Sequence, residues 1–287
     1  MSVKGKHVFR PASRFLIAVV LVLAWCGGGT ALAQSQVETI IQRSVEANER
    51  DWKADPEYNY FERDVENGVS KTNHVTMIEG SPYYRLTEIN GKRLSESEQA
   101  KEERKLQQAI AERRHESAQQ RAARIAQYQK DRKRDHLMME QLTKAFNFTL
   151  TGEQKLGDFQ VYVLQATPRP GYVPPNRDTR VLTGMNGTLW IDKQSYQWVK
   201  VEAQVIHPVS IEGFLARVEP GTEFELEKTP VGDGVWLPTR FRMKAHARIL
   251  ALFSHNEQEE DSYWDYQKTA AASGGIQQSA NDGEPAK

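Results

Sequence analysis

Three successive segments near the C-terminus alternate charged and apolar residues, and this alternation constrains the fold more than any other feature. Acidic residues alternate with Phe224 and Leu226 in the first segment, and basic residues alternate with Phe241 and Met243 in the second. The third segment, residues 257–265, is acidic again. A period of two is typical of β-strands with one polar and one apolar face. We therefore expect an antiparallel meander whose basic strand pairs with two acidic ones, above a wholly apolar opposite face.

Strand-like runs recur through most of the chain. Residues 58–64 and 69–79 flank an Asn67-Gly68 pair, which is a strong hairpin signal. The whole pattern predicts about ten strands, joined by hairpins and by one helical excursion, and hence an antiparallel sheet. Ten strands with one apolar face must curl or stack. The expected fold class is α+β, a curled antiparallel sheet that forms an incomplete β-barrel covered by helices.

Residues 36–53 are expected to form an amphipathic helix. Apolar side chains recur there with the spacing of one buried stripe: Val37, Ile40, Ile41 and Val45. A second helical region, the insertion 95–143, is highly charged: 19 of the 40 residues from 96 to 135 are charged, with no Gly or Pro. A capping box starts it at Ser95. We expect one long solvated helix, or two helices broken near Glu116-Ser117. The proline-rich residues 168–184 are expected to form a loop or flap.

The first 33 residues are expected to direct export. Four basic residues precede an apolar run, Phe15–Cys26, and Ala31-Leu32-Ala33 provides a small-x-small cleavage pattern. The 12-residue run is shorter than the roughly 20 residues of a membrane-spanning helix. We expect a signal peptide cleaved after Ala33, a soluble periplasmic domain over 34–268, and a disordered tail over 269–287. The alternatives are a retained membrane anchor and a lipoprotein with lipid on Cys26, although Trp25 is bulky for such processing.

Composition excludes several kinds of function. Beyond residue 33 the chain has 34 basic and 38 acidic residues, a formal charge of −4, so it lacks the basic field of a nucleic-acid binder. Its single cysteine, Cys26, lies in the export segment, which leaves no disulfide or thiol nucleophile beyond it. No zinc, calcium, phosphate-loop, dinucleotide or serine-nucleophile motif is present. We therefore expect no metal, no cofactor and no catalytic residue, and a protein that is not an enzyme.

Two hairpin motifs carry a resemblance to a known family. The segment Gly187-Thr-Leu-Trp-Ile-Asp192, followed by Trp198-Val-Lys-Val-Glu202, and the turn Gly234-Val-Trp-Leu-Pro238 resemble motifs of the LolA/LolB-like superfamily. The resemblance covers roughly residues 184–268. It implies a periplasmic carrier or receptor of lipoproteins, with a helical lid over a hydrophobic cavity in an incomplete barrel. The charged insertion and the proline-rich loop depart from the compact carriers of that family.

The leading hypothesis is an exported protein that binds a lipid, an acyl chain or a lipoprotein in this cavity, as a carrier. The alternative is an envelope sensor or scaffold that uses the helical insertion 95–143 to bind a protein partner. Apolar strand residues expected to point inward are the candidate ligand contacts, although each also fits an ordinary core. They are Met77, Leu86, Phe148, Val161, Val163, Leu189, Ile191, Val199, Val201, Phe224, Leu226, Phe241 and Met243.

Overall fold

The computed structural model describes residues 26–66, 68–211, 216–249 and 253–269. Most of the expected signal peptide and tail therefore lies outside the described residues, and the domain boundaries stay predictions. The helices are α2 (Cys26–Ala54), η1 (Asp55–Glu57), α3 (Glu96–His115), α4 (Ala118–Ala145) and η2 (Asp178–Gly184). The long strands are β1 (Tyr58–Glu66), β2 (Val69–Ile78), β3 (Ser81–Ile89), β5 (Phe146–Leu156), β6 (Phe159–Pro168), β7 (Met185–Asp192), β8 (Trp198–Val205), β11 (Glu223–Gly232), β12 (Val235–Ile249) and β13 (Phe253–Lys268). The short ones are β4 (Lys92–Arg93), β9 (Val209–Ser210) and β10 (Ala216–Val218).

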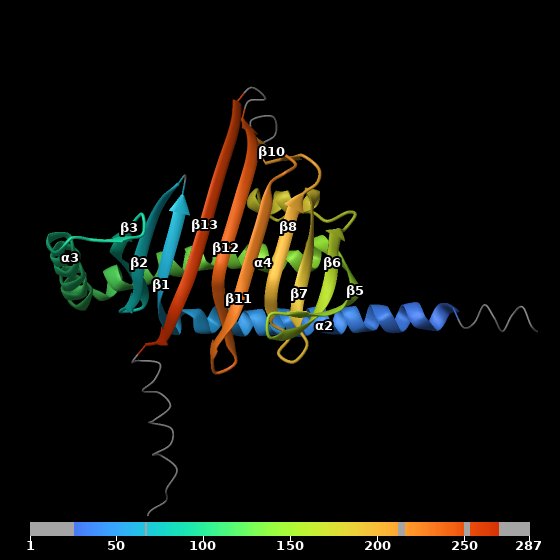
Figure 1. The fold of residues 1–287 in the computed structure, drawn as a ribbon, viewed down its shortest axis with the longest axis horizontal. Coiled ribbons are helices and arrows are strands. Elements are labelled where there is room, and N and C mark those ends of the chain that lie inside the picture. The colour runs from blue at the N-terminus through green and yellow to red at the C-terminus, as the bar shows by residue number, and fades with distance from the viewer. Residues whose placement is uncertain (1–25, 67, 212–215, 250–252, 270–287) are drawn as a thin grey trace, which may run out of the picture.

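The strands form one open antiparallel sheet (Figure 1). Its order is β4-β3-β2-β1-β13-β12-β11-β8-β7-β6-β5, with β9 and β10 attached beside β12. The first and last long strands, β1 and β13, are neighbours, while β4 and β5 are the two free edges. The expected α+β class, with an incomplete barrel covered by helices, is confirmed.

Two long helices cross one side of the sheet, and α3 lies beyond its β3 end (Figure 1). Val37 and Ile40 of α2 are buried against Leu164 and Ile191 of the sheet, and Leu142 of α4 packs on the same cluster. The helix α2 starts ten residues earlier than the expected Gln36 and crosses the predicted cleavage point.

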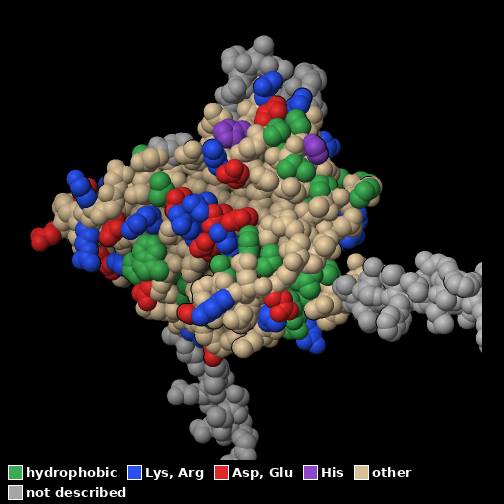
Figure 2. All heavy atoms as spheres, turned by 45° about the vertical axis from the view of Figure 1, so that its right-hand side comes forward, with side chains coloured by type: hydrophobic (Ala, Val, Ile, Leu, Met, Phe, Trp, Pro, Cys, Tyr) green, Lys and Arg blue, Asp and Glu red, His purple; other side chains and the backbone are tan. Residues whose placement is uncertain are grey.

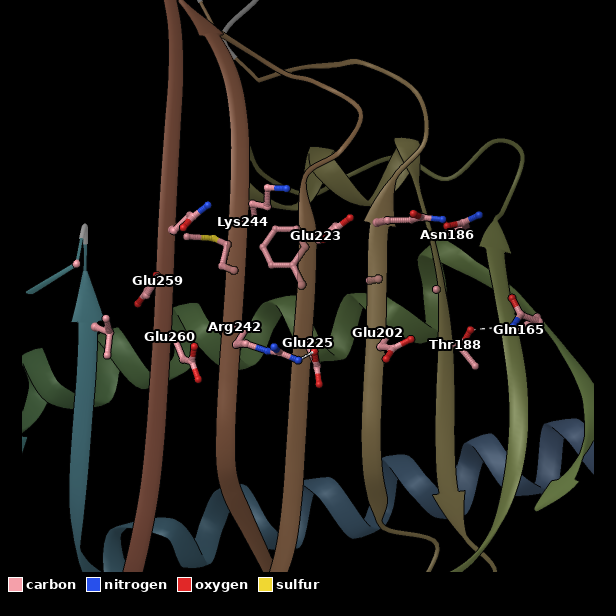
Figure 3. A pocket seen from close by; sticks show the side chains of 18 residues that line it. Gln165, Asn186, Thr188, Glu202, Glu223, Glu225, Arg242, Lys244, Glu259 and Glu260 are labelled. Carbon is pink, nitrogen blue, oxygen red and sulfur yellow. Dashed lines mark hydrogen bonds and ion pairs between the residues drawn. The ribbon is translucent and has the colours of Figure 1, made fainter. Parts of the chain in front are cut away.

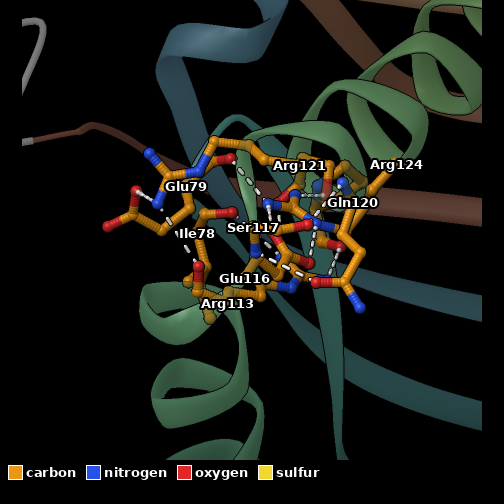
Figure 4. Close-up of polar contacts among 10 residues, drawn as sticks. Ile78, Glu79, Arg113, Glu116, Ser117, Gln120, Arg121 and Arg124 are labelled. Carbon is orange, nitrogen blue, oxygen red and sulfur yellow. Dashed lines mark hydrogen bonds and ion pairs between the residues drawn. The ribbon is translucent and has the colours of Figure 1, made fainter.

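The charged insertion consists of two helices that meet at Glu116-Ser117, which is the second of the two expected alternatives. Ser95 begins α3 with a capping box, and Ser117 begins α4 with a second one. Two arginines dock this α3–α4 elbow on the turn between β2 and β3 (Figure 4). Arg113 donates to the carbonyl oxygens of three turn residues, and Arg124 donates to Ser81 Oγ at 2.6 Å. The insertion is therefore fixed to the sheet by polar contacts at its corner.

A buried carboxylate fixes the C-terminal end of α2. Asp51 accepts hydrogen bonds from Lys228 Nζ at 2.6 Å, from Gln197 Nε2 at 3.0 Å and from the Trp236 backbone N–H at 3.0 Å. Asn48 accepts a further bond from Lys228. We call this group the Asp51 hub.

The expected charged ladder forms on the side of the sheet away from the helices. Arg242 pairs with Glu225, and Arg240 pairs with Glu260 at 2.6 Å. The expectation that the opposite face is wholly apolar is wrong. The acidic residues of β13 are consecutive, so alternate ones turn toward the helix side, where Asp261 lies opposite Asp64 of β1.

The segment 168–184 is only partly the expected loop. Its end forms the 3-10 helix η2, in which Thr179, Val181 and Leu182 are buried. Val181 and Leu182 belong to the same core cluster as Val37 and Ile40 of α2. Among the described residues, every helix is too short or too polar to cross a membrane.

Candidate functional site

Five of the residues predicted to bind ligand lie in the helix-covered core: Phe148, Leu189, Ile191, Val201 and Phe224. Leu189 and Ile191 are 5 and 0% exposed, so helices already fill the space above them. This part of the predicted cavity is closed in the structure.

Three predicted residues lie on the opposite side of the sheet. Val161, Val163 and Val199 pack around Trp236 in a second cluster, and Val163 lies opposite Trp190. Strand β6 is apolar on both faces near this end, so alternation alone does not reveal which face turns inward. In β8 the register shifts between the pairs Trp190–Lys200 and Ile191–Trp198, so that Val199 and Val201 do not face the same side of the sheet. The prediction that all the candidates share one face is wrong for these three.

Three further predicted residues, Leu226, Phe241 and Met243, are half-buried and belong to strands β11 and β12. In register, Leu226 lies opposite both Val201 and Phe241, and Met243 lies opposite Phe224. They thus extend the helix side of the sheet beyond the closed core.

The two others, Met77 and Leu86, come from β2 and β3. Met77 lines a pocket against α4, and Leu86 lies opposite Asn73. The structure thus places these two apart from the aliphatic core.

A shallow valley crosses the outer side of the sheet, away from α2 and α4 (Figure 3). It has a volume of about 690 Å³ and a charged lining that includes Glu202, Glu225 and Arg242. Lys200 links Glu202 at 2.8 Å and Glu225 at 3.1 Å. Acidic and basic side chains are intermixed on this face (Figure 2). The lining has five glutamates against Arg242 and Lys244, so the valley is charged, with an acidic surplus, and offers no apolar site.

A groove lies between residues 34–46 of α2 and strand β5. It measures about 670 Å³, a size typical of small-molecule sites. Its apolar lining consists of Val37, Ile41, Val45 and Phe148, and polar side chains, among them Glu38, Glu46 and Arg169, form the rest. We call it the apolar groove after the four apolar residues. Three of them also pack on the core under the helices, so groove and core are continuous. The fourth, Val45, is 40% exposed.

The two ends of α2 are held in different ways. From residue 34 to 47, the side-chain hydrogen bonds of the described structure stay within the helix. Apolar packing and one cation–π contact, Arg43 over Tyr196 at 4.8 Å, hold this half. The last turns instead carry the Asp51 hub and a 2.8 Å contact from His136 to Glu49. The segment of α2 that lines the groove, residues 34–47, therefore makes no side-chain hydrogen bond to another element of the described structure.

Two features of the site were not predicted from the sequence. The groove uses the expected buried stripe of residues 36–53, but its position beside β5 depends on tertiary packing. One sequence feature could have predicted the Asp51 hub. Lys228 continues the alternation of Phe224 and Leu226, and a lysine on the apolar face of a strand needs a buried partner for its charge. Among the described residues, no cluster of three or more His, Cys, Asp or Glu is placed to hold a metal ion.

No protein-family model matches the sequence, and no curated protein matches it. Three solved structures are similar to the chain. One is described as an outer membrane lipoprotein-sorting protein domain from Vibrio parahaemolyticus; it is 16% identical, covers 44% of this chain and 43% of its own, and has a TM-score of 0.26.

The other two structures cover more of the chain. A DUF1329 family protein from Desulfovibrio piger is 10% identical over 82% of this chain and 93% of its own, with a TM-score of 0.31. A LolA superfamily protein from Nitrosomonas europaea is 14% identical over 81% and 93%, with a TM-score of 0.28. These identities and TM-scores provide no residue-by-residue correspondence to this chain.

Proposed function

We propose that the protein is exported to the periplasm, where it binds the acyl chain of a lipid or lipoprotein as a carrier, without catalysing a reaction. The observation that carries the proposal is the apolar groove beside α2, which is continuous with the helix-covered core. An acyl chain lying in the groove would contact Ile41 and Phe148 and would extend toward the core.

The first half of α2 provides a route for the rest of the chain. Residues 34–47 can separate from the sheet without breaking a side-chain hydrogen bond to another element, because apolar contacts, chiefly of Val37 and Ile40, and the cation–π contact of Arg43 with Tyr196 hold this segment. Burying two such side chains contributes about 3–6 kcal/mol in total. Since each buried methylene group contributes about 0.8 kcal/mol, an acyl segment of about four to eight methylene groups would compensate for the lost helix packing.

Substitution within the groove tests this proposal. Ile41→Glu places a carboxylate in the apolar lining, whereas Thr39→Glu adds the same charge to an exposed position of the same helix. We expect Ile41→Glu to weaken binding of a fluorescent fatty acid at least tenfold, since the variant replaces apolar contact area by a charge that must lose water when the acyl chain binds. The Thr39→Glu protein should bind like the wild type.

Native mass spectrometry of detergent-free protein from a bacterial periplasm provides the second readout. We expect a co-purifying mass that solvent extracts as lipid, and its loss in the Ile41→Glu protein. A clean apo mass that does not change after incubation with envelope lipids, together with equal fatty-acid binding by both variants, would refute the acyl-chain proposal.

One observation favours the alternative function as a sensor or scaffold. None of the side chains of α3 is buried, although the helix has 20 residues and is fixed at its corner. Such a helix can present its surface to a protein partner. Replacing the exposed Lys101 and Arg104 by glutamine should abolish this partner binding and leave fatty-acid binding unchanged. The groove variant should show the reverse pattern if the protein acts as a carrier.

A further inference from the structure

A second pocket, distinct from the apolar groove, lies between the β1–β3 end of the sheet and α4. Its volume is about 520 Å³. Three tyrosines line it, two from strands and one from α4, and three arginines line it from the elbow and from α4. They are Tyr60, Tyr84, Tyr128, Arg113, Arg124 and Arg132. We call this the Arg/Tyr pocket.

The three guanidinium groups are held in place but retain unused donors. Each guanidinium has five N–H groups. In the described structure Arg113 makes three hydrogen bonds, to the carbonyl oxygens of the β2–β3 turn. Arg124 makes four, and Arg132 makes two. Their positions are fixed before any ligand arrives, and N–H groups remain for one.

The charge of these arginines is only partly neutralised. Arg124 is paired with Glu116 at 2.7 Å, but the hydrogen bonds of Arg113 go to neutral carbonyl oxygens. Burial and the nearby Arg124 charge lower the pKa of Arg113, against the opposing effect of Glu116. An anion beside Arg113 would relieve both effects.

Two carboxylates also line the pocket, and both already have partners. Asp55 lies 3.8 Å from Arg132 Nε, and Asp131 accepts from Gln127 at 3.0 Å and lies 3.7 Å from Arg134. Three arginines against these two aspartates leave the lining with a formal surplus of one positive charge.

The tyrosines add neutral hydrogen-bond donors. Burial raises the pKa of Tyr128 to about 12 and raises that of Tyr60 further, so both phenols keep their protons at neutral pH. Arginine forks and phenol hydroxyls together suit the tetrahedral oxygens of a phosphate group.

We propose that the Arg/Tyr pocket binds a phosphate ester, which belongs either to a lipid headgroup or to a small soluble molecule. Arg113 and Arg124 contribute charge at the elbow, and Tyr128 donates a hydrogen bond from α4. The proposal does not depend on the acyl groove, because the two sites share no lining residue.

Calorimetric titration of the whole protein tests it with three probes: glycerol 3-phosphate, dihexanoyl phosphatidylglycerol below its micellar concentration, and benzyltrimethylammonium. We expect at least one phosphate probe to bind. Tyr128→Phe keeps the ring and should weaken that binding about three- to tenfold through the loss of one hydrogen bond. Asp55→Asn removes a negative charge and should tighten it about threefold or more.

Matched controls separate this proposal from the acyl groove. Lys155→Gln removes an exposed charge from β5, and Ile41→Glu alters the groove; both should leave binding of the phosphate group unchanged. Binding of glycerol 3-phosphate identifies a soluble ligand. Binding of the phosphatidylglycerol probe alone identifies a headgroup site if Tyr128→Phe weakens it and Ile41→Glu does not, and the reverse pattern assigns it to the acyl groove and refutes the headgroup site. If neither phosphate probe binds, or if Asp55→Asn weakens phosphate binding and the ammonium probe binds instead, the proposal is wrong.

Discussion

Two regions on the helix side of the sheet bury carboxylates in opposite surroundings. In the Asp51 hub, the carboxylate receives three hydrogen bonds, and Asp51 and Lys228 are only 4 and 7% exposed. At the junction of β1 and β13, which we call the acidic seam, carboxylates face one another instead. Asp64 lies opposite Asp261, and Glu62 is adjacent on the same face.

The difference shows that a buried carboxylate can either fix a structure or make it sensitive to pH. The hub supplies both carboxylate oxygens of Asp51 with a donor, so it anchors α2. The seam brings like charges together across two strands, which is unfavourable. Burial and the charges of Asp261, Asp64 and Glu259 raise the pKa of Glu62 to about 7. The pKa values of Asp261 and Glu259 are raised for the same reasons.

The largest effect is expected at the hub. Asp51→Ala removes three acceptor bonds and leaves Lys228 without its counter-ion, in a place where burial already lowers the pKa of the lysine. Breaking a buried pair from one side costs about 3–5 kcal/mol. Urea unfolding followed by tryptophan fluorescence measures this loss.

The matched control for the hub is Asp233→Asn, which removes the charge and keeps a side chain that tolerates the left-handed backbone at this position (φ 52°). Asp233 is paired with Lys268 at 2.6 Å, but its side chain is 64% exposed. An exposed pair contributes about 0–1 kcal/mol. Equal losses in the two variants would show that the hub is no stronger than a surface pair.

The acidic seam should give the next largest effect, and with a dependence on pH. Because the folded pKa of Glu62 lies above its ordinary value of 4.5, the folded state binds the proton more tightly. Its stabilising contribution is present below about pH 4.5 and is lost as the pH rises through about 7. This loss is at most about 3 kcal/mol for one residue. The free energy of unfolding should therefore fall between about pH 5 and pH 8.

Glu62→Gln tests that trend, because the amide cannot ionise. We expect the variant to be more stable than the wild type at high pH and to show a smaller fall. Glu153→Gln, at an exposed site paired with Lys193, should follow the wild-type curve. A Glu62→Gln protein with an unchanged pH profile would contradict the interpretation of the seam.

The comparison also separates what the sequence can predict from what it cannot. The charged ladder followed from alternation, since Glu225 and Arg242 occupy equivalent phases of adjacent strands. The seam could not follow from it, because the consecutive acids of β13 have no alternation to read. Their partner strand β1 also lies about 200 residues earlier in the chain, so the opposition of Asp64 and Asp261 exists only after folding.

The candidate site was predictable to a similar degree. Phe148 and Ile41 lie in predicted apolar patterns, and both contact the groove or its core. Val199 was placed on the wrong face because an irregularity in β8 shifts the phase, and a single sequence does not show such a shift. The Arg/Tyr pocket was not predicted, since it depends on how the α3–α4 elbow docks.

The smallest effect is expected on the outer ladder, where opposite charges face each other on the side of the sheet away from the helices. Arg242 pairs with Glu225, but Glu225 also contacts Lys200, which has Glu202 as another partner at 2.8 Å. Because these partners can substitute for one another, Glu225→Gln should cost only about 0.2–1 kcal/mol, and less at high salt. A double-mutant cycle with Arg242→Met measures the coupling by urea unfolding. A coupling free energy above about 2 kcal/mol would make the ladder as important to stability as the buried regions. A coupling free energy below about 1 kcal/mol means that the alternating charges select which strands pair, while the Asp51 hub and the helix-covered core hold the fold together.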